Sequence, residues 1–103
     1  MAKSIKVFLS QPMNVKEEKV IRLEEQLYLC MVKKRLGYNN LERVGWVKED
    51  CGEKGPLFYL AKSIEAMNDA DIVVFCPGWE QARGCRIEWE VAREYGKKIV
   101  YLG

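Results

Sequence analysis

The chain has 103 residues, 49% of them hydrophobic and 31% charged, which suits one compact domain with a single core and does not suggest a second domain. Its 17 basic and 15 acidic residues give a net charge of +2 and are spread along the sequence, without the basic block that would bind a nucleic-acid polymer. No apolar run approaches the roughly 20 residues that span a bilayer, and the first residues begin a strand pattern instead of a signal peptide. We therefore expect one soluble, cytoplasmic domain.

The residue types present narrow the chemistry. The chain has no histidine, and its four cysteines form no CxxC pair, so we expect no metal site. Without an imidazole as general base, Ser-His-Asp and Cys-His nucleophiles are excluded. Neither a GxGxxG nor a Walker A sequence is present, so we expect no cofactor. Any catalysis must therefore use carboxylates, hydroxyls or thiols.

The first predicted elements are a strand and a long helix. Apolar and β-branched residues at alternate positions of 4–10 fit a strand that ends near Ser10. A helix is expected from about Val15 to Leu36, with Gly37 as its stop. An amphipathic helix is indicated by an apolar stripe at spacings of three and four, opposite Glu and Lys: Val20, Leu23, Leu27 and Met31.

The middle of the chain, from Gly37 to Pro56, is predicted to be mostly loop, with a short, weak strand over 42–47. Residues 68–71 break the helical pattern that follows, and the apolar run 72–75 predicts a strand buried on both faces. The helix between these regions is marked by Leu57, Leu60, Ala61 and Ile64.

The last predicted elements are a loop through Gly78, a helix from about Gly84 to Tyr95, a turn at Gly96 and a strand over 98–102. Strands that alternate with helices predict a small doubly wound α/β domain, with a parallel sheet of about four or five strands and helices on both faces. Ligands of such sheets bind beyond the carboxyl ends of the strands. This rule makes the loops 10–14 and 76–83 the candidate ligand-binding segments.

The last helix places one carboxylate, Glu88, among apolar side chains. With residues at about 100° intervals, the apolar arc around it is formed by Ile87, Val91, Ala92 and Tyr95. Burying an unpartnered carboxylate costs on the order of several kcal/mol, so this position indicates supplied donors or a use for the group. A place near the first helical turn favours the ionised form, which suits a carboxylate nucleophile. The alternative is an ion pair with Arg83 or Arg86.

Other candidate residues have a structural interpretation beside a functional one. Asp69 and Asp71 precede the buried strand, where a helix stop and a turn account for them more readily than catalysis does. Trp79, after a predicted turn, could stack on a flat ligand or belong to the core. Arg83, near a helix start, could clamp an anion or form a surface ion pair.

The chain resembles the nucleoside 2-deoxyribosyltransferase-like superfamily, most closely its small bacterial and phage branch labelled DUF4406. The resemblance lies in the segments VFLSQPM, MNDADIVVFCPGWEQARG and EWEVAREYGKKIVYL, and does not cover 37–56. It implies a flavodoxin-like domain that cleaves or exchanges the N-glycosidic bond of a (deoxy)nucleoside or nucleotide.

The resemblance also implies roles for single residues. The nucleophile of the family is a Glu followed four positions later by Ala and then by Gly-Lys, and Glu88, Ala92 and Gly96-Lys97 match this pattern. Asp71 matches an acidic residue at the start of the buried strand and is the second implied catalytic group. The implied substrate-binding residues are Ser10, Gln11, Pro12, Met13, Pro77, Gly78, Trp79, Arg83 and Gly84.

Departures from the family pattern leave a second function open. Gln11 stands where glycine is usual, Glu90 stands where a small residue is usual, and 77–84 replaces a loop that carries an Asp in the relatives. These departures favour a binding module for a nucleotide-like ligand or a protein partner, whereas Glu88 favours the enzyme. Because a domain this small buries limited surface, we also expect a homo-oligomer that uses the long first helix.

Overall fold

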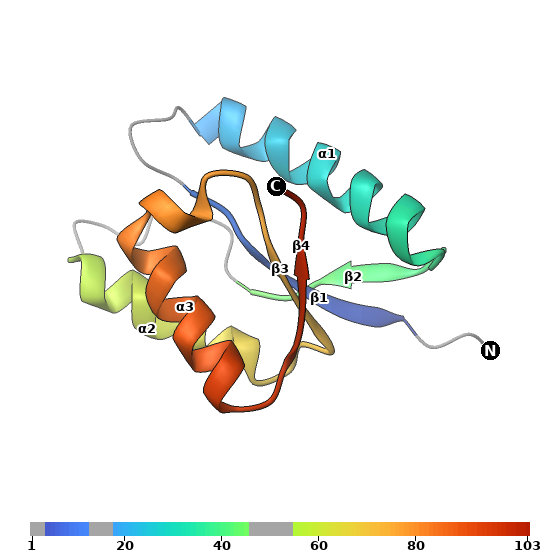
Figure 1. The fold of residues 1–103 in the computed structure, drawn as a ribbon. Coiled ribbons are helices and arrows are strands. Elements are labelled where there is room, and N and C mark those ends of the chain that lie inside the picture. The colour runs from blue at the N-terminus through green and yellow to red at the C-terminus, as the bar shows by residue number, and fades with distance from the viewer. Residues whose placement is uncertain (1–3, 13–17, 46–54) are drawn as a thin grey trace.

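The computed structural model describes residues 4–12, 18–45 and 55–103 (Figure 1). In chain order its elements are β1 (Ile5–Ser10), α1 (Glu18–Leu36), β2 (Leu41–Arg43), α2 (Pro56–Met67), β3 (Ile72–Phe75), the short 3₁₀ helix η1 (Trp79–Gln81), α3 (Arg83–Glu94) and β4 (Lys98–Tyr101). The sequence pattern does not predict η1. The expected helix start near Val15 and positions 46–47 of the expected weak strand lie outside the described residues.

The sheet has four strands in the order β2-β1-β3-β4, and every neighbouring pair is parallel. This arrangement confirms the predicted small doubly wound α/β fold. The chain leaves β1 toward β2 on one side and returns to β3 on the other, so the winding reverses between β1 and β3. Since Ser10 pairs with Phe75, β1 and β3 end at the same level. Ligands of doubly wound sheets bind at such a reversal, beyond the strand ends.

Helices cover both faces of the sheet (Figure 1), with α1 on one face and α2 and α3 together on the other. The alternation of side chains along β1 divides the core between these layers. Val7 and Leu9 pack with α1, whereas Phe8 packs with residues of α2 and α3. All residues of β3 are buried, as expected for an inner parallel strand.

Helix α1 meets the sheet through a different face from the predicted apolar stripe. Its buried residues are Ile21, Tyr28 and Val32. Val20, Leu23 and Leu27 are exposed, and of the predicted stripe Met31 packs against the core. The predicted stripe is therefore mostly not the face that packs on the sheet. Helix α1 carries two apolar stripes, and periodicity alone does not tell which of them faces the sheet.

Helix α1 ends where the sequence predicts. Gly37 has a φ of 74°, and its N–H donates to the carbonyl of Lys33 at 2.9 Å, which closes the last turn. Three basic residues in that turn interact favourably with the helix dipole. Across 4–12, 18–45 and 55–103, no helix combines the length and the apolar character needed to cross a membrane.

Candidate functional site

The loops after β1 and β3 lie side by side at the carboxyl edge of the sheet. The N–H of Cys76 donates to the carbonyl of Ser10 at 3.0 Å, which continues the pairing to the strand ends. A Cβ atom on Gly78 would lie 3.6 Å from Cγ of Pro12, so the two loops are in near contact. Gly78 also has a φ of 87°, a conformation that favours glycine. Met13, predicted for the same loop, lies outside the described residues.

Helix α3 starts at this edge and buries Glu88. The carboxylate-bearing residue is 7% exposed, so the prediction that it faces inward is confirmed. The other buried residues of the helix are Cys85 and Ala92. Ile87 and Tyr95, predicted in the same apolar arc, are 38% and 80% exposed, so that part of the prediction is wrong. The buried face of α3 is therefore formed by Cys85, Glu88 and Ala92 and is narrower than the predicted arc.

The Glu88 carboxylate bonds to hydroxyl groups of two other elements. Ser10 Oγ donates to Glu88 Oε1 at 2.7 Å, and Ser63 of α2 supplies a second hydroxyl. Burial raises the pKa of Glu88, and the hydrogen bonds of Ser10 and Ser63 oppose this rise because they stabilise the ionised form. Among the described residues no arginine pairs with Glu88, and Arg86 donates instead to the carbonyl of Glu80 at 3.0 Å.

Two members of this site, Ser63 and Cys85, are missed by the sequence reasoning. Burial raises the pKa of the Cys85 thiol to about 11, its hydrogen bond with Ser10 opposes the rise, and the charge of Glu88 adds to it. Helical spacing is the signal that could have found both. Cys85 lies three positions before Glu88, and Ser63 lies four positions before the buried Met67. Ser10, Ser63, Cys85 and Glu88 are called the Glu88 cluster below.

Gln11 follows Ser10 but bonds to the opposite helical layer. Its Nε2 donates to the carbonyl of Ile21 at 2.9 Å, and the residue is buried. Its Oε1 is buried and has no hydrogen-bond partner among the described residues. Gln11 thus ties the loop after β1 to helix α1.

Trp79 belongs to an aromatic group at the end of β3 and β4. Its ring stacks on Trp89 of α3 at a centroid distance of 5.9 Å and also contacts Phe75 and Tyr101. Trp89 Nε1 donates to the hydroxyl of Tyr101 at 2.8 Å, which holds the group together. Trp79 is half-buried, so it is both part of the core and accessible at the rim.

The remaining predicted site residues divide between the two edges of the sheet. Pro77, Arg83 and Gly84 are exposed at the carboxyl edge, beside the start of α3. Asp71 is exposed at the opposite edge, before β3, where its Oδ2 accepts from the backbone N–H of Lys6 at 2.8 Å. The structure therefore does not bring Asp71 together with Glu88.

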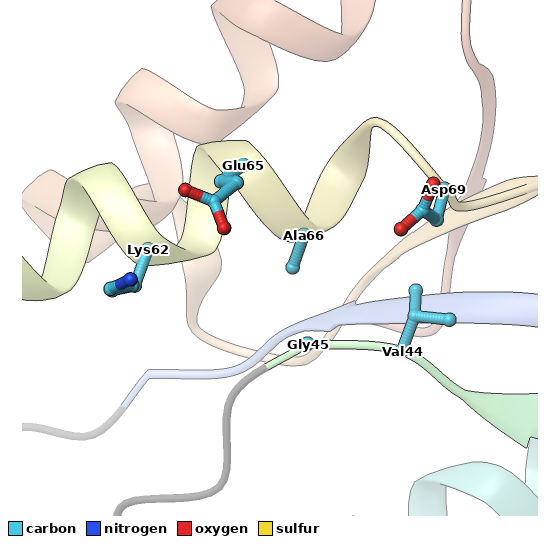
Figure 2. Close-up of a pocket in the computed structure, with 6 residues that line it drawn as sticks. All are labelled: Val44, Gly45, Lys62, Glu65, Ala66 and Asp69. Carbon is cyan, nitrogen blue, oxygen red and sulfur yellow. The ribbon is translucent and has the colours of Figure 1, made fainter.

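A pocket of about 260 Å³ lies between α2 and the end of β2 (Figure 2). Lys62, Glu65, Ala66 and Asp69 line it from the helix side, and Val44 and Gly45 line it from the strand side. It includes no member of the Glu88 cluster. The pocket is open, so its charged side chains are in contact with solvent.

Comparison with curated proteins finds no match to the chain. The family model described as "Domain of unknown function (DUF4406)" matches residues 5–101, which include β1 through β4 and the whole Glu88 cluster. The chain therefore belongs to the DUF4406 family.

Proposed function

We propose that this protein is a cytoplasmic enzyme of the nucleoside 2-deoxyribosyltransferase-like type, which cleaves or exchanges the N-glycosidic bond of a (deoxy)nucleoside or nucleotide with Glu88 as nucleophile. The observation that carries the proposal is the position of Glu88. It is a buried carboxylate beneath the carboxyl edge of a doubly wound sheet, held by the hydroxyl of Ser10 at 2.7 Å. A charge is rarely placed in a core without a use or a partner ion.

The proposed reaction has two steps. A carboxylate oxygen of Glu88 attacks the anomeric carbon, the carbon–nitrogen bond breaks, and the base leaves with the bonding electron pair and takes up a proton from solvent. Water or a second base then attacks the same carbon and gives a proton to solvent, and the bond between the sugar and Glu88 breaks to release the carboxylate. The anomeric carbon gains positive charge in both transition states, and a carboxylate on one face of the sugar stabilises that charge.

The groups around Glu88 suit this chemistry. The Ser10 and Ser63 hydroxyls orient the carboxylate and stabilise its ionised form. The Glu88 carboxyl group must lose its proton before it can attack, and burial raises its pKa. The proposed activity therefore falls as the pH is lowered. The rim residues Trp79 and Arg83 are available to a base and to a phosphate, respectively. Asp71 has no part in the proposal because it lies at the opposite edge of the sheet.

The test is base release from a panel of purine and pyrimidine nucleosides, deoxynucleosides and their monophosphates, followed by chromatography. Wild type should release free base from at least one substrate. Glu88→Gln and Glu88→Ala should abolish the release, because neither side chain can attack the sugar. Circular dichroism of both variants would show that the fold is retained.

Glu90→Gln is the matched control on the same helix. Glu90 is exposed and pairs with Arg93 at 2.7 Å, so this substitution should leave base release close to that of wild type. The proposal fails if folded wild type releases no base from any member of the panel, or if a Glu88 variant keeps full activity.

The extent of burial supports a second candidate, a binding module on the same fold. Glu88 is only 7% exposed and its partners are the protein's own hydroxyls, as in a structural cluster that holds α2, α3 and β1 together. The rim of the two loops would then hold a nucleotide-like ligand without reaction. Calorimetry with the same panel separates the candidates, because a binding module gives heat of binding with wild type and with Glu88→Gln but no product.

A further inference from the structure

The outer face of α1 carries an apolar stripe that no part of the described chain covers. Leu23 and Leu27 are 60% and 57% exposed, and Val20 is 41% exposed. Of the other large apolar side chains exposed in the described residues, Leu57, Ile87 and Tyr101 lie on three different elements. Tyr38 and Tyr95 lie outside the helices and strands. A contiguous exposed apolar stripe of this kind indicates an interaction surface.

The spacing of the stripe indicates which kind of structural element would pack on it. Val20, Leu23, Leu27 and Cys30 recur at intervals of three, four and three, which is the narrow seam of a two-helix coiled coil. Packing on a sheet requires a wider arc, and α1 already supplies that arc on its other side with Leu29, Met31 and Val32. The outer seam is therefore shaped for one helix.

The charges beside the seam point to a second copy of α1 in parallel orientation. Lys19 directly precedes Val20, and Glu24 directly follows Leu23. In a parallel pair these two flanking positions face each other across the seam, so Lys19 of each copy lies opposite Glu24 of the other. In an antiparallel pair Glu24 would instead face the same residue of its partner, and like charges there destabilise the pair.

We propose that the protein is a homodimer formed by parallel pairing of its α1 helices along Val20, Leu23, Leu27 and Cys30. The two-fold axis runs along the seam, so each residue of the stripe meets its own counterpart. At 19 residues and about 1.5 Å per residue, α1 is long enough for the seam to extend over several turns. The proposal does not depend on the chemistry assigned to Glu88.

Sedimentation velocity at micromolar concentration tests the dimer. Wild type should sediment as a dimer, and Leu27→Glu should convert it to a monomer, because a buried seam would hold two facing carboxylates. The matched control is Leu57→Glu, since Leu57 is 79% exposed on α2 and lies outside the seam. The control should remain dimeric. A monomeric wild type, or a dimer that survives Leu27→Glu, would overturn the proposal.

Oxidative crosslinking tests the parallel orientation. In a Cys51→Ser background, mild oxidation should link Cys30 to the partner's Cys30 and give a covalent dimer on a non-reducing gel. Cys76 and Cys85 are buried and should not react. Adding Cys30→Ser should abolish the product. Absence of a covalent dimer before this second substitution would contradict parallel pairing.

Discussion

Helices α1 and α3 lie on opposite faces of the sheet. Each has side chains in an environment that is unusual for them, polar in the core or apolar at the surface. Helix α3 buries a carboxylate at Glu88, whereas α1 exposes Leu23 and Leu27. The two departures differ in their cost. A buried carboxylate opposes folding and must be stabilised by donors such as Ser10, whereas an exposed leucine costs little until the chain meets a partner.

The two helices therefore suit different kinds of role. Glu88 is held at a fixed place inside one molecule, which suits chemistry on a small substrate. The stripe on α1 is fixed only as a surface, which suits association. Each assignment can be tested without the other, because α1 and the Glu88 cluster lie on opposite faces of the sheet.

The largest expected change in the free energy of unfolding distinguishes the buried face of α1 from its exposed face. Ile21→Ala should lower the free energy of unfolding by about 2–5 kcal/mol, because Ile21 is buried and its truncation leaves a cavity. Leu27→Ala should change it by no more than about 0.5 kcal/mol when the protein is dilute enough to be monomeric. Urea denaturation of both variants at low protein concentration measures the difference. If Leu27→Ala were as destabilising as Ile21→Ala, the outer stripe would have to pack within the same molecule.

Glu88→Gln should raise the free energy of unfolding, by less than Ile21→Ala lowers it. Because the folded-state pKa of Glu88 is raised, the folded protein holds this proton more tightly than the unfolded chain does. The stabilising contribution is complete below the ordinary pKa of about 4.5 and is lost as the pH rises through the folded-state pKa. Glutamine does not ionise, so Glu88→Gln does not lose this contribution as the pH rises. The variant should be more stable than wild type at neutral pH.

Unfolding free energies between pH 4 and pH 8, roughly the range in which carboxyl groups with raised pKa titrate, measure this difference. Glu90→Gln is the control, since Glu90 is exposed. Its pH profile should follow that of wild type. A Glu88→Gln profile parallel to that of wild type would show that Glu88 is not strained by burial.

Much of the fold could be predicted because its signals are local. The apolar run 72–75 identifies an inner strand, and Gly37 marks the end of α1. The alternation of strands and helices then leaves few topologies other than a doubly wound parallel sheet. The packing face of α1 could not be predicted, because the stripes that contain Leu27 and Val32 have similar periodicity and only the sheet distinguishes them.

The candidate site was predictable in part. Helical periodicity places Glu88 inward without any knowledge of the rest of the chain. Its hydrogen bond to Ser10 spans 78 positions, and its contact with Ser63 comes from another helix, so neither partner follows from local pattern. The resemblance groups Asp71 with Glu88, but a residue before a parallel strand lies at the opposite edge of the sheet from residues after it.

The covalent intermediate of the proposed reaction can be detected directly, as sugar bonded to Glu88 during turnover. The protein would be quenched with acid while it releases base, digested, and analysed by mass spectrometry. If Glu88 is the nucleophile, a peptide containing Glu88 should have its mass increased by one glycosyl group, and no such peptide should form in Glu88→Gln. Base release with an unmodified Glu88 peptide, or with the glycosyl group on another residue, would contradict the assignment of Glu88 as the nucleophile.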